Sequence, residues 1–311
     1  MAAFDLVVVG DANPDVLITG APAVPPYGQA ETLVATGSLA LGGSAAIVAH
    51  AAARLGLSTA LVAMVGRDPA GDFVLDALTS AGVDISACTR HERAPTALTV
   101  CLGTAGGDRA ILTAAGCLDA FDPQSLPKAR HVHAASYFLQ PRMAAGLTGL
   151  FSTARAAGAT TSLDTNHDPA GRWEVDPDLF ALCDYVLPNE SEALALTGVA
   201  TVEDALVAFA EAGATPVVKR GSDGAMALSG GESVTVRGAA ADPVDTVGAG
   251  DSFDAGFLAG MLETGDLGRA LALGCACGAL STRAAGGTAG QPSWGEAAAY
   301  AVAVTAATRI G

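Results

Sequence analysis

The stretch from Asp245 to Phe257 combines a glycine-rich turn, a carboxylate and the start of an amphipathic helix. Gly248, Ala249 and Gly250 have little or no side chain, so their backbone N–H groups can approach an anion closely. The positive end of the following helix dipole points the same way. Asp251 could then accept a proton from a hydroxyl group that meets the anion there. Phosphoryl transfer needs this combination of proton acceptor and charge-stabilising donors.

Asp251 also has a simpler explanation, because an acidic residue at a helix N-terminus stabilises the helix dipole without any chemistry. Taken alone, the residue is compatible with both roles. The complete pattern Asp-Thr-Val-Gly-Ala-Gly-Asp, which starts at Asp245, favours the catalytic role.

A second stretch, from Gly42 to Gly56, begins with a Gly-Gly pair and continues as an alanine-rich helix. Together with the glycine-rich turn, it resembles the two sequence hallmarks of the ribokinase (PfkB) family of carbohydrate and nucleoside kinases. Further matching segments follow in family order: Val65–Asp68, Gly82–Asp84, Asp164–Asn166, Pro188–Glu192 and Lys219–Gly224. The resemblance covers nearly the whole chain. It implies a kinase that uses ATP and Mg²⁺.

In this resemblance Asp251 matches the catalytic base of the family. The positions that match nucleotide-binding residues are Asn189, Lys219, Gly221, Gly224, Thr246, Gly248, Gly250 and Cys275. Asn189 and Glu192 match a motif that acts near Mg²⁺, usually through water, which suits a strongly hydrated cation. An Asn N-cap with an acidic first helical turn explains this pair equally simply. Asp245 and Val247 match ligands of a monovalent cation such as K⁺, although aspartates also form turns.

Asn13 and Asp15 follow the first strand, where open parallel sheets bind ligands. Asn13 and Asp15 match family positions that bind sugar hydroxyls, and an amide beside a carboxylate suits groups that both donate and accept. Gly42 and Gly43 match the backbone that approaches the sugar. Ile47 is a departure, because the family usually has a substrate-facing Asn there.

Asp164 and Asn166 match an Asp-x-Asn pair that lies near the sugar or the phosphates in the family. Asp168 stands where some members have Arg, which weakens the case for an already phosphorylated or carboxylated substrate. Arg109 is the remaining candidate for contact with such a group, and a solvated arginine is its simpler role.

The main prediction is therefore a kinase that phosphorylates a hydroxyl of a small sugar. A nucleoside kinase of the same family is the alternative within the class, since Ile47 could suit a base better than a third sugar hydroxyl. A non-catalytic sugar-binding sensor is the alternative from another class. The intact turn and Asp251 argue against the sensor.

The composition narrows the range of partners. Acidic residues number 32 and basic residues 16 among 311, which gives a net charge of −16. Lys128 and Lys219 are the only lysines. We therefore expect no nucleic-acid partner, because no basic face could neutralise a row of phosphates. The N-terminus lacks the basic region of a secretory signal, and the uncharged stretch from Leu33 to Ala53 is too rich in Ala, Gly, Ser and Thr to favour a membrane span. A cytoplasmic protein with free cysteines is expected.

The order of elements predicts an α/β fold with a doubly wound, mostly parallel sheet flanked by helices. The resemblance implies that this fold is of the ribokinase type, with a small β-sheet lid. Strands are expected at 6–9, 60–65, 132–135, 161–163, 185–187 and 216–218. Helices are expected at 44–55, 70–81, 144–157, 190–196, 202–212, 249–264, 267–284 and 293–308.

Residues 15–36 and 96–113 break this alternation and look like antiparallel strands. In the resembled family such segments form the lid, so we assign 1–14, 37–95 and 114–311 to the α/β domain. Exposed lid edges could pair in a homodimer, and a monomer with charged edges is equally consistent. His131 and His133 share one face of a strand, where a role in the core is favoured over a metal pair.

Overall fold

The computed structural model describes residues 3–308 apart from 105, 107 and 239–241. The strands of the main sheet are β1 (Phe4–Val9), β4 (Thr59–Val62), β9 (Ala129–Ala135), β10 (Thr160–Asp164), β11 (Tyr185–Val186), β12 (Thr215–Lys219), β13 (Ala225–Ser229) and β14 (Glu232–Val236). Their order is β14-β13-β12-β11-β10-β9-β1-β4. The strands from β12 to β4 are parallel, and β13 and β14 add an antiparallel hairpin at one edge.

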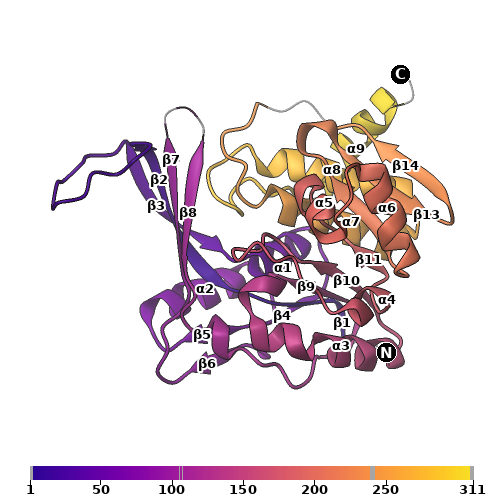
Figure 1. Cartoon of the computed structure of the whole chain (residues 1–311), viewed down its shortest axis with the longest axis horizontal. Helices are drawn as coiled ribbons and strands as arrows, with labels where there is room; N and C mark the ends of the chain where they lie inside the picture. The colour runs from indigo at the N-terminus through magenta and orange to yellow at the C-terminus, as the bar shows by residue number, and fades with distance from the viewer. Residues whose placement is uncertain (1–2, 105, 107, 239–241, 309–311) are drawn as a thin grey trace.

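Helices cover both faces of this sheet (Figure 1). One face carries α1 (Ser44–Arg54), α2 (Pro69–Ser80), α7 (Ala249–Thr264), α8 (Leu267–Ser281) and α9 (Trp294–Thr308). The other carries α3 (Pro141–Ala156), α4 (Pro177–Ala181), α5 (Glu190–Thr197) and α6 (Val202–Glu211). Parallel strands need such double cover because both of their faces must be buried. The predicted α/β fold with a mainly parallel sheet is confirmed.

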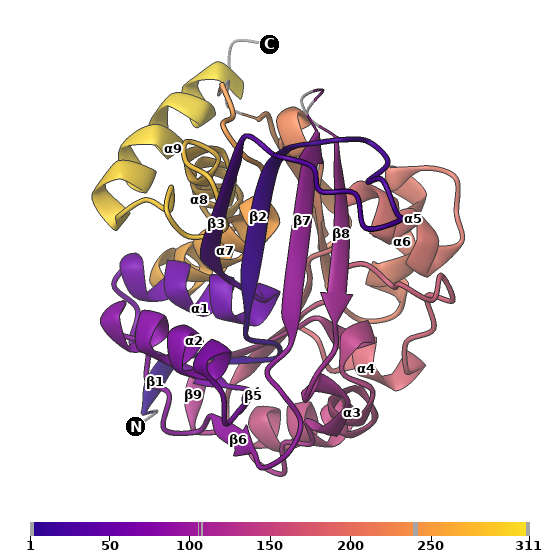
Figure 2. The same ribbon diagram turned by 90° about the vertical axis from the view of Figure 1, so that its left-hand side faces the viewer.

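A second sheet projects from the α/β body (Figures 1 and 2). Its strands are β2 (Asn13–Ala21), β3 (Thr36–Gly42), β7 (Leu98–Thr104) and β8 (Arg109–Ala114), in the order β3-β2-β7-β8. The outer pairs are antiparallel as expected, but β2 and β7 run parallel. β3 includes residues 37–42, which the sequence analysis places in the α/β domain. Residues 105 and 107, in the tip between β7 and β8, lie outside the described residues.

The structure corrects the prediction of a single strand at 60–65. β4 ends at Val62, and the chain continues as β5 (Met64–Gly66), which pairs with β6 (Thr89–His91) in a separate two-stranded sheet. The β13–β14 hairpin and α4 have no predicted counterpart. Short 3-10 turns occur at Leu118–Ala120, Tyr137–Leu139 and Gly221–Asp223. Within the described ranges no single helix is long and apolar enough to span a membrane. The helices α5 and α6 together reach the necessary length and hydropathy, but a sharp bend separates them.

Candidate active site

The predicted chemical residues converge where strands end and helices begin. Asp164 and Lys219 are the last residues of β10 and β12. Ser44 is the first residue of α1, and Asp251 lies in the first turn of α7. The carboxyl ends of parallel strands and the N-termini of helices are the usual binding edge of such a sheet.

Gly248 is the N-cap of α7 and has a φ of 71°, in the left-handed region that favours glycine. A Cβ there would also lie 2.6 Å from the Cα of Gly287, in the loop after α8. At Gly250 a Cβ would lie 3.5 Å from the Nζ of Lys219. The Ala249 N–H makes a 3.3 Å bond to the Thr246 carbonyl. The turn therefore combines helix N–H donors with a nearby ammonium group, as an anion site requires.

The carboxylate of Asp251 accepts a hydrogen bond from the Ser44 hydroxyl, which joins the starts of α7 and α1. Burial raises the pKa of Asp251 to about 7, the Asp164 charge adds to this, and the Ser44 bond and Lys219 oppose it. A carboxylate with a pKa near neutrality can accept a proton and release it again.

Lys219 lies between two buried carboxylates beside Asp251. Its Nζ is 2.6 Å from Asp164 Oδ2 and 3.1 Å from both oxygens of Asp254. Burial opposes the charge of Lys219, but the two aspartates outweigh it and raise its pKa. Burial raises the pKa of Asp254 well above its usual value. One oxygen each of Asp164, Asp251 and Asp254 lie within 4.8 Å of one another, and the Lys219 ammonium neutralises part of their charge.

The predicted sugar-binding residues also come together. Asn13 Nδ2 donates to Asp15 Oδ1 at 3.0 Å and to Thr99 Oγ1 at 3.2 Å. A Cβ at Gly42 would lie 2.0 Å from Asp15 Oδ1, so only glycine fits beside that carboxylate. Gly43 has a φ of 85° and lies against Asn13 and the Asp11 carbonyl. Burial raises the pKa of Asp15 to about 7, and the nearby Asp11 and Asp245 charges add to this.

Ile47 offers no polar side chain at this site. It is buried, and its Cδ1 atom would lie 2.6 Å from a Cβ at Gly287. Asn166 has a φ of 55° and bonds to Asp164 through its backbone N–H at 3.0 Å. Its side-chain oxygen accepts the Ser136 N–H at 2.7 Å, so the pair Asp164 and Asn166 shapes the ends of β9 and β10.

Arg109 links the four-stranded sheet to the turn before α7. Its Nη1 lies 3.4 Å from Asp245 Oδ1, which also accepts the Val247 N–H at 3.0 Å. The other oxygen of Asp245 accepts the Gly286 N–H at 2.9 Å. Asp245 therefore joins the four-stranded sheet, the approach to α7 and the loop after α8.

Asn189 and Glu192 form a capping box at the start of α5. The Asn189 side chain accepts the Glu192 N–H at 2.9 Å, and Glu192 Oε2 accepts the Asn189 N–H at 2.8 Å. Burial raises the pKa of Glu192 to about 7, and the Asp164 charge adds to this while Lys219 opposes it. The simple capping role is thus present. The charge of Glu192 also interacts with those of Asp164 and Lys219.

Three other predicted positions have structural explanations of their own. A Cβ at Gly224 would lie 2.0 Å from the Val236 carbonyl, so this glycine admits β14. At Gly221 a Cβ would meet nothing within 4 Å, and the position is open. Cys275 is buried among the helices of the first face, and burial raises the pKa of its thiol to about 12. An inert core thiol is the result.

The sequence profile of the pfkB family carbohydrate kinases matches residues 3–294. The chain belongs to this family. An ATP-dependent ribose-1-phosphate kinase of Halopiger xanaduensis is 36% identical over 255 residues, which cover 77% of this chain and 79% of the relative. The fold resembles a ribokinase of Arabidopsis thaliana in complex with ribose and ATP, with a TM-score of 0.85, 25% identity and coverage of 97% and 99% of the two chains.

A fructokinase of Vibrio cholerae, solved with fructose, ADP and potassium, has a TM-score of 0.77 and 25% identity, with 96% and 99% of the chains covered. As a PfkB-family carbohydrate kinase, the chain is a phosphotransferase that acts on an alcohol group.

Some residues of this PfkB-family site are not identified by the sequence analysis. Asp254 could have been identified from the sequence, because it lies three residues after Asp251 and so shares its helix face. Ser44 directly follows the Gly-Gly pair. Asp11 accepts the Ala45 N–H at 3.1 Å and fixes α1 against the end of β1. Hydrogen bonds between residues that are far apart in the sequence leave no pattern in a single sequence.

Proposed function

We propose that this kinase transfers the γ-phosphoryl group of ATP to a hydroxyl of a small sugar, with Asp251 as general base. The observation that carries this proposal is the position of the Asp251 carboxylate. It follows the glycine turn of α7 and lies within 4.8 Å of the carboxylates that hold Lys219. Proton acceptor, anion-binding turn and cation thus meet at one point.

The sugar hydroxyl would take the place of Ser44 as the hydrogen-bond donor to Asp251. Its oxygen attacks the γ-phosphorus while its proton passes to the carboxylate, and the bond from phosphorus to the leaving ADP oxygen breaks. N–H groups of Gly248, Ala249 and Gly250 would stabilise the negative charge of the transferring group, the Ala249 N–H after it leaves the Thr246 carbonyl. Lys219, beside Gly250, would offset part of the negative charge of Asp164 and Asp254 next to the transferring group.

Asn189 and Glu192 would bind Mg²⁺ through its water molecules. Their oxygens suit a hard cation, and the capping bond of Glu192 uses only Oε2 of its two oxygens. When bound, Mg²⁺ neutralises charge on the β- and γ-phosphates. The segments at Lys219, Gly221, Gly224, Thr246 and Cys275 complete the nucleotide side by family resemblance. Asp245 and the Val247 carbonyl would hold a monovalent cation such as K⁺.

The sugar would bind between Asn13, Asp15, Gly42 and Gly43, with Asp164 and Asn166 nearby. We propose that residues 15–36 and 96–113 act as a lid that excludes water from the reacting groups. Arg109 faces the same region and would contact an anionic substituent after leaving Asp245. A nucleoside is the second candidate acceptor, because Ile47 has an apolar side chain at a position where the family usually has a substrate-facing Asn.

The proposed function is tested by ADP release from ATP and Mg²⁺ with a panel of acceptors. The panel contains D-ribose, ribose 1-phosphate, D-fructose, sugar acids and nucleosides. A hit among the sugars is expected. If only nucleosides react, the acceptor class is wrong. If sugars raise the melting temperature but none releases ADP, the protein is a sugar-binding sensor.

We predict that kcat/KM rises with pH through the region near 7, where Asp251 loses its proton. The sign follows because only the ionised carboxylate can accept the hydroxyl proton. The Ser44 hydrogen bond lowers the pKa of Asp251. Ser44→Ala should therefore move the inflection of the pH–rate profile to higher pH and weaken activity most on the acid side. Ser58→Ala, far from the site, is the control. An unchanged inflection in Ser44→Ala would assign the profile to Asp15 or Glu192, whose pKa values also lie near 7.

We propose that the four-stranded sheet also forms a homodimer interface. Among the described residues, seven of the eleven exposed large hydrophobic side chains lie in this sheet and the β2–β3 connection: Val24, Tyr27, Leu33, Val34, Leu39, Ile111 and Leu112. Strand register aligns Leu39, Val16, Val100 and Leu112 in one row across the sheet. This row faces away from Asp15 and Thr99, since neighbouring residues alternate between faces.

Leu112→Asp is therefore expected to convert a dimer into a monomer in sedimentation velocity experiments, because the charge would be buried in the interface. Val207→Asp, at an exposed position on α6, is the matched control. A wild-type protein that sediments as a monomer at micromolar concentration contradicts the dimer.

We further place the reaction in the cytoplasm, where ATP is available and the six free cysteines remain reduced.

A further inference from the structure

One face of the two central strands β9 and β10 carries a run of polar side chains. Thr160, Ser162 and Asp164 alternate along β10, and His131 and His133 alternate along β9. All but Thr160 are buried. Central parallel strands that are covered on both faces normally carry apolar side chains. A buried polar row has a cost that such a sheet usually avoids.

Four of these side chains, those of Thr160, His131, Ser162 and His133, form a continuous hydrogen-bonded chain, which we call the polar row. Thr160 Oγ1 lies 2.7 Å from His131 Nδ1, and His131 Nε2 lies 2.7 Å from Ser162 Oγ. Ser162 Oγ lies 2.8 Å from His133 Nδ1. One serine hydroxyl therefore connects the two imidazoles, and it can donate to only one of them at a time.

The His133 end of the polar row lies toward the active-site residue Asp164, which follows Ser162 on the same face of β10. His133 Nε2 is buried and has no hydrogen-bond partner among the described residues. The charges of Asp164 and Lys219 both act on this ring. An unpaired polar atom in a core requires an explanation. The two charges that act on this ring belong to Asp164 and Lys219, which together with Asp254 form an ionic cluster beside Asp251.

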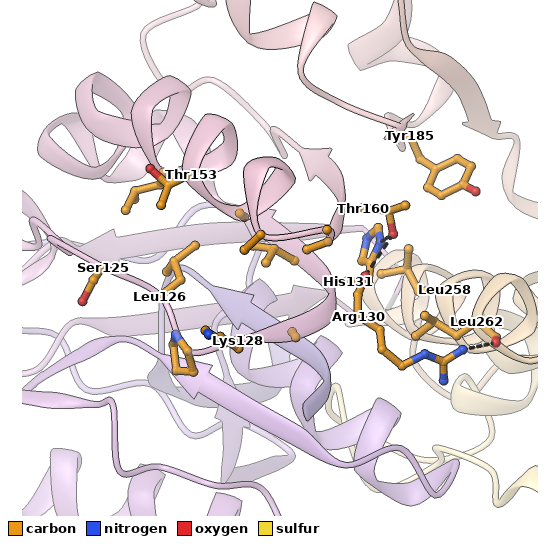
Figure 3. A pocket seen from close by; sticks show the side chains of 18 of the residues that line it. Ser125, Leu126, Lys128, Arg130, His131, Thr153, Thr160, Tyr185, Leu258 and Leu262 are labelled. Carbon is orange, nitrogen blue, oxygen red and sulfur yellow. Dashed lines mark hydrogen bonds between the residues drawn. The ribbon is translucent and has the colours of Figure 1, made fainter. Parts of the chain in front are cut away.

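The Thr160 end of the polar row opens into a cavity of about 840 Å³ near the amino ends of β9 and β10 (Figure 3). Thr160 and His131 line it, as do the exposed residues Lys128 and Arg130. The Thr160 hydroxyl also donates to the Arg130 carbonyl at 3.3 Å. The polar row thus runs from His133, on which the charges of Asp164 and Lys219 act, to the protein surface.

α7 extends from the active site to the cavity. Its first turns carry Asp251 and Asp254, and its last turns carry Leu258 and Leu262, which line the cavity. Burial lowers the pKa of His131 to about 3 and that of His133 to about 4. Both rings are therefore neutral, and a neutral imidazole has one N–H donor and one acceptor nitrogen.

We propose that the polar row is a proton relay that carries the proton taken up by Asp251 through the sheet to the cavity. The proposal rests on the proposed function, in which a hydroxyl proton must leave a site closed against water. Phosphorylation of an alcohol by ATP releases this proton, and a closed lid blocks its direct path to solvent.

The transfer balances one proton in against one proton out. Asp251 passes its proton to Asp164, Asp164 passes it to His133 Nε2, and both carboxylates are then ionised as before. The Nδ1 proton of His133 passes to Ser162. The Ser162 proton passes to His131 Nε2, and the Nδ1 proton of His131 passes to Thr160. Thr160 gives its own proton to water in the cavity. Every ring and hydroxyl is then neutral again with its hydrogen bonds reversed.

The test compares two rates in a single turnover, with enzyme in excess over ATP and with the panel acceptor that gives the fastest ADP release. Quenched flow measures the phosphorylated acceptor, and stopped flow with a pH indicator in weak buffer measures the released proton. In the wild type the two rates should coincide. In Ser162→Ala the phosphorylated acceptor should still form, but the proton should appear later, at the rate of product release.

Ser162→Thr keeps a hydroxyl and should restore coincidence of the two rates. Thr161→Val removes a buried hydroxyl from the opposite face of β10 and should cause no delay. Coincident rates in Ser162→Ala would overturn the relay and leave the proposed function intact. Failure of every acceptor to release ADP would instead overturn the proposed function, and the relay with it.

Discussion

Replacement of Asp251 by Asn is expected to lower kcat about 10²- to 10⁴-fold, which is the usual contribution of a general base. The amide has nearly the same size as the carboxylate but cannot take the hydroxyl proton. ATP binding should persist, because the turn around Gly248 and Gly250 is unchanged. Steady-state ADP release and nucleotide titration of the variant measure the two effects separately.

Asp204→Asn is the matched control, because Asp204 also lies in the first turn of a helix, α6, on the surface. A carboxylate that only stabilises a helix dipole would give the same small effect at both positions. Equal, near-normal kcat values for the two variants would remove Asp251 from the chemistry.

Lys219→Met is expected to destabilise the fold by about 3–5 kcal/mol, the usual cost of removing one partner from a buried ion pair. The reason is that Asp164 and Asp254 would remain buried without their cation. The loss should grow as the pH rises from acid to neutral, because the unfolded chain ionises both carboxyl groups in their usual pKa range while burial holds them protonated in the folded variant. Urea denaturation at several pH values measures it.

Lys128→Met provides a control, since Lys128 is the other lysine and lies on the surface. Its effect should stay within about 0.5 kcal/mol, as for most surface substitutions. Adding Asp254→Asn to Lys219→Met should recover part of the lost stability, because one uncompensated charge is removed. A stability of Lys219→Met equal to that of the wild type would contradict the ionic cluster.

The helices were predictable because their apolar periodicity and end signals are local. α7 begins and ends where the pattern places it, at Ala249 and Thr264. The β13–β14 hairpin was also predictable in principle. Gly230 and Gly231 link its strands with φ values of 59° and 83°, and a Gly-Gly pair between short strands indicates such a turn.

Other features could not be predicted from local sequence. The apolar run at 60–65 has no signal for the change of sheet after Val62, because both strands are equally apolar. The ionic cluster joins Lys219 to Asp164, 55 residues away in the sequence, and to Asp254, 35 residues away. The resemblance places Lys219 beside the nucleotide, but only the fold shows that two aspartates hold its ammonium group.

The most direct measurement is a crystal structure with a non-hydrolysable ATP analogue, Mg²⁺ and the best acceptor from the panel. Our account predicts that the reacting hydroxyl oxygen lies about 2.6–3.2 Å from the Asp251 carboxylate, the distance of a hydrogen bond to a general base. The γ-phosphate should lie against the N–H groups at the start of α7. A reacting hydroxyl bound instead to Asp15, with Asp251 still bonded to Ser44 and remote from the acceptor, would contradict it.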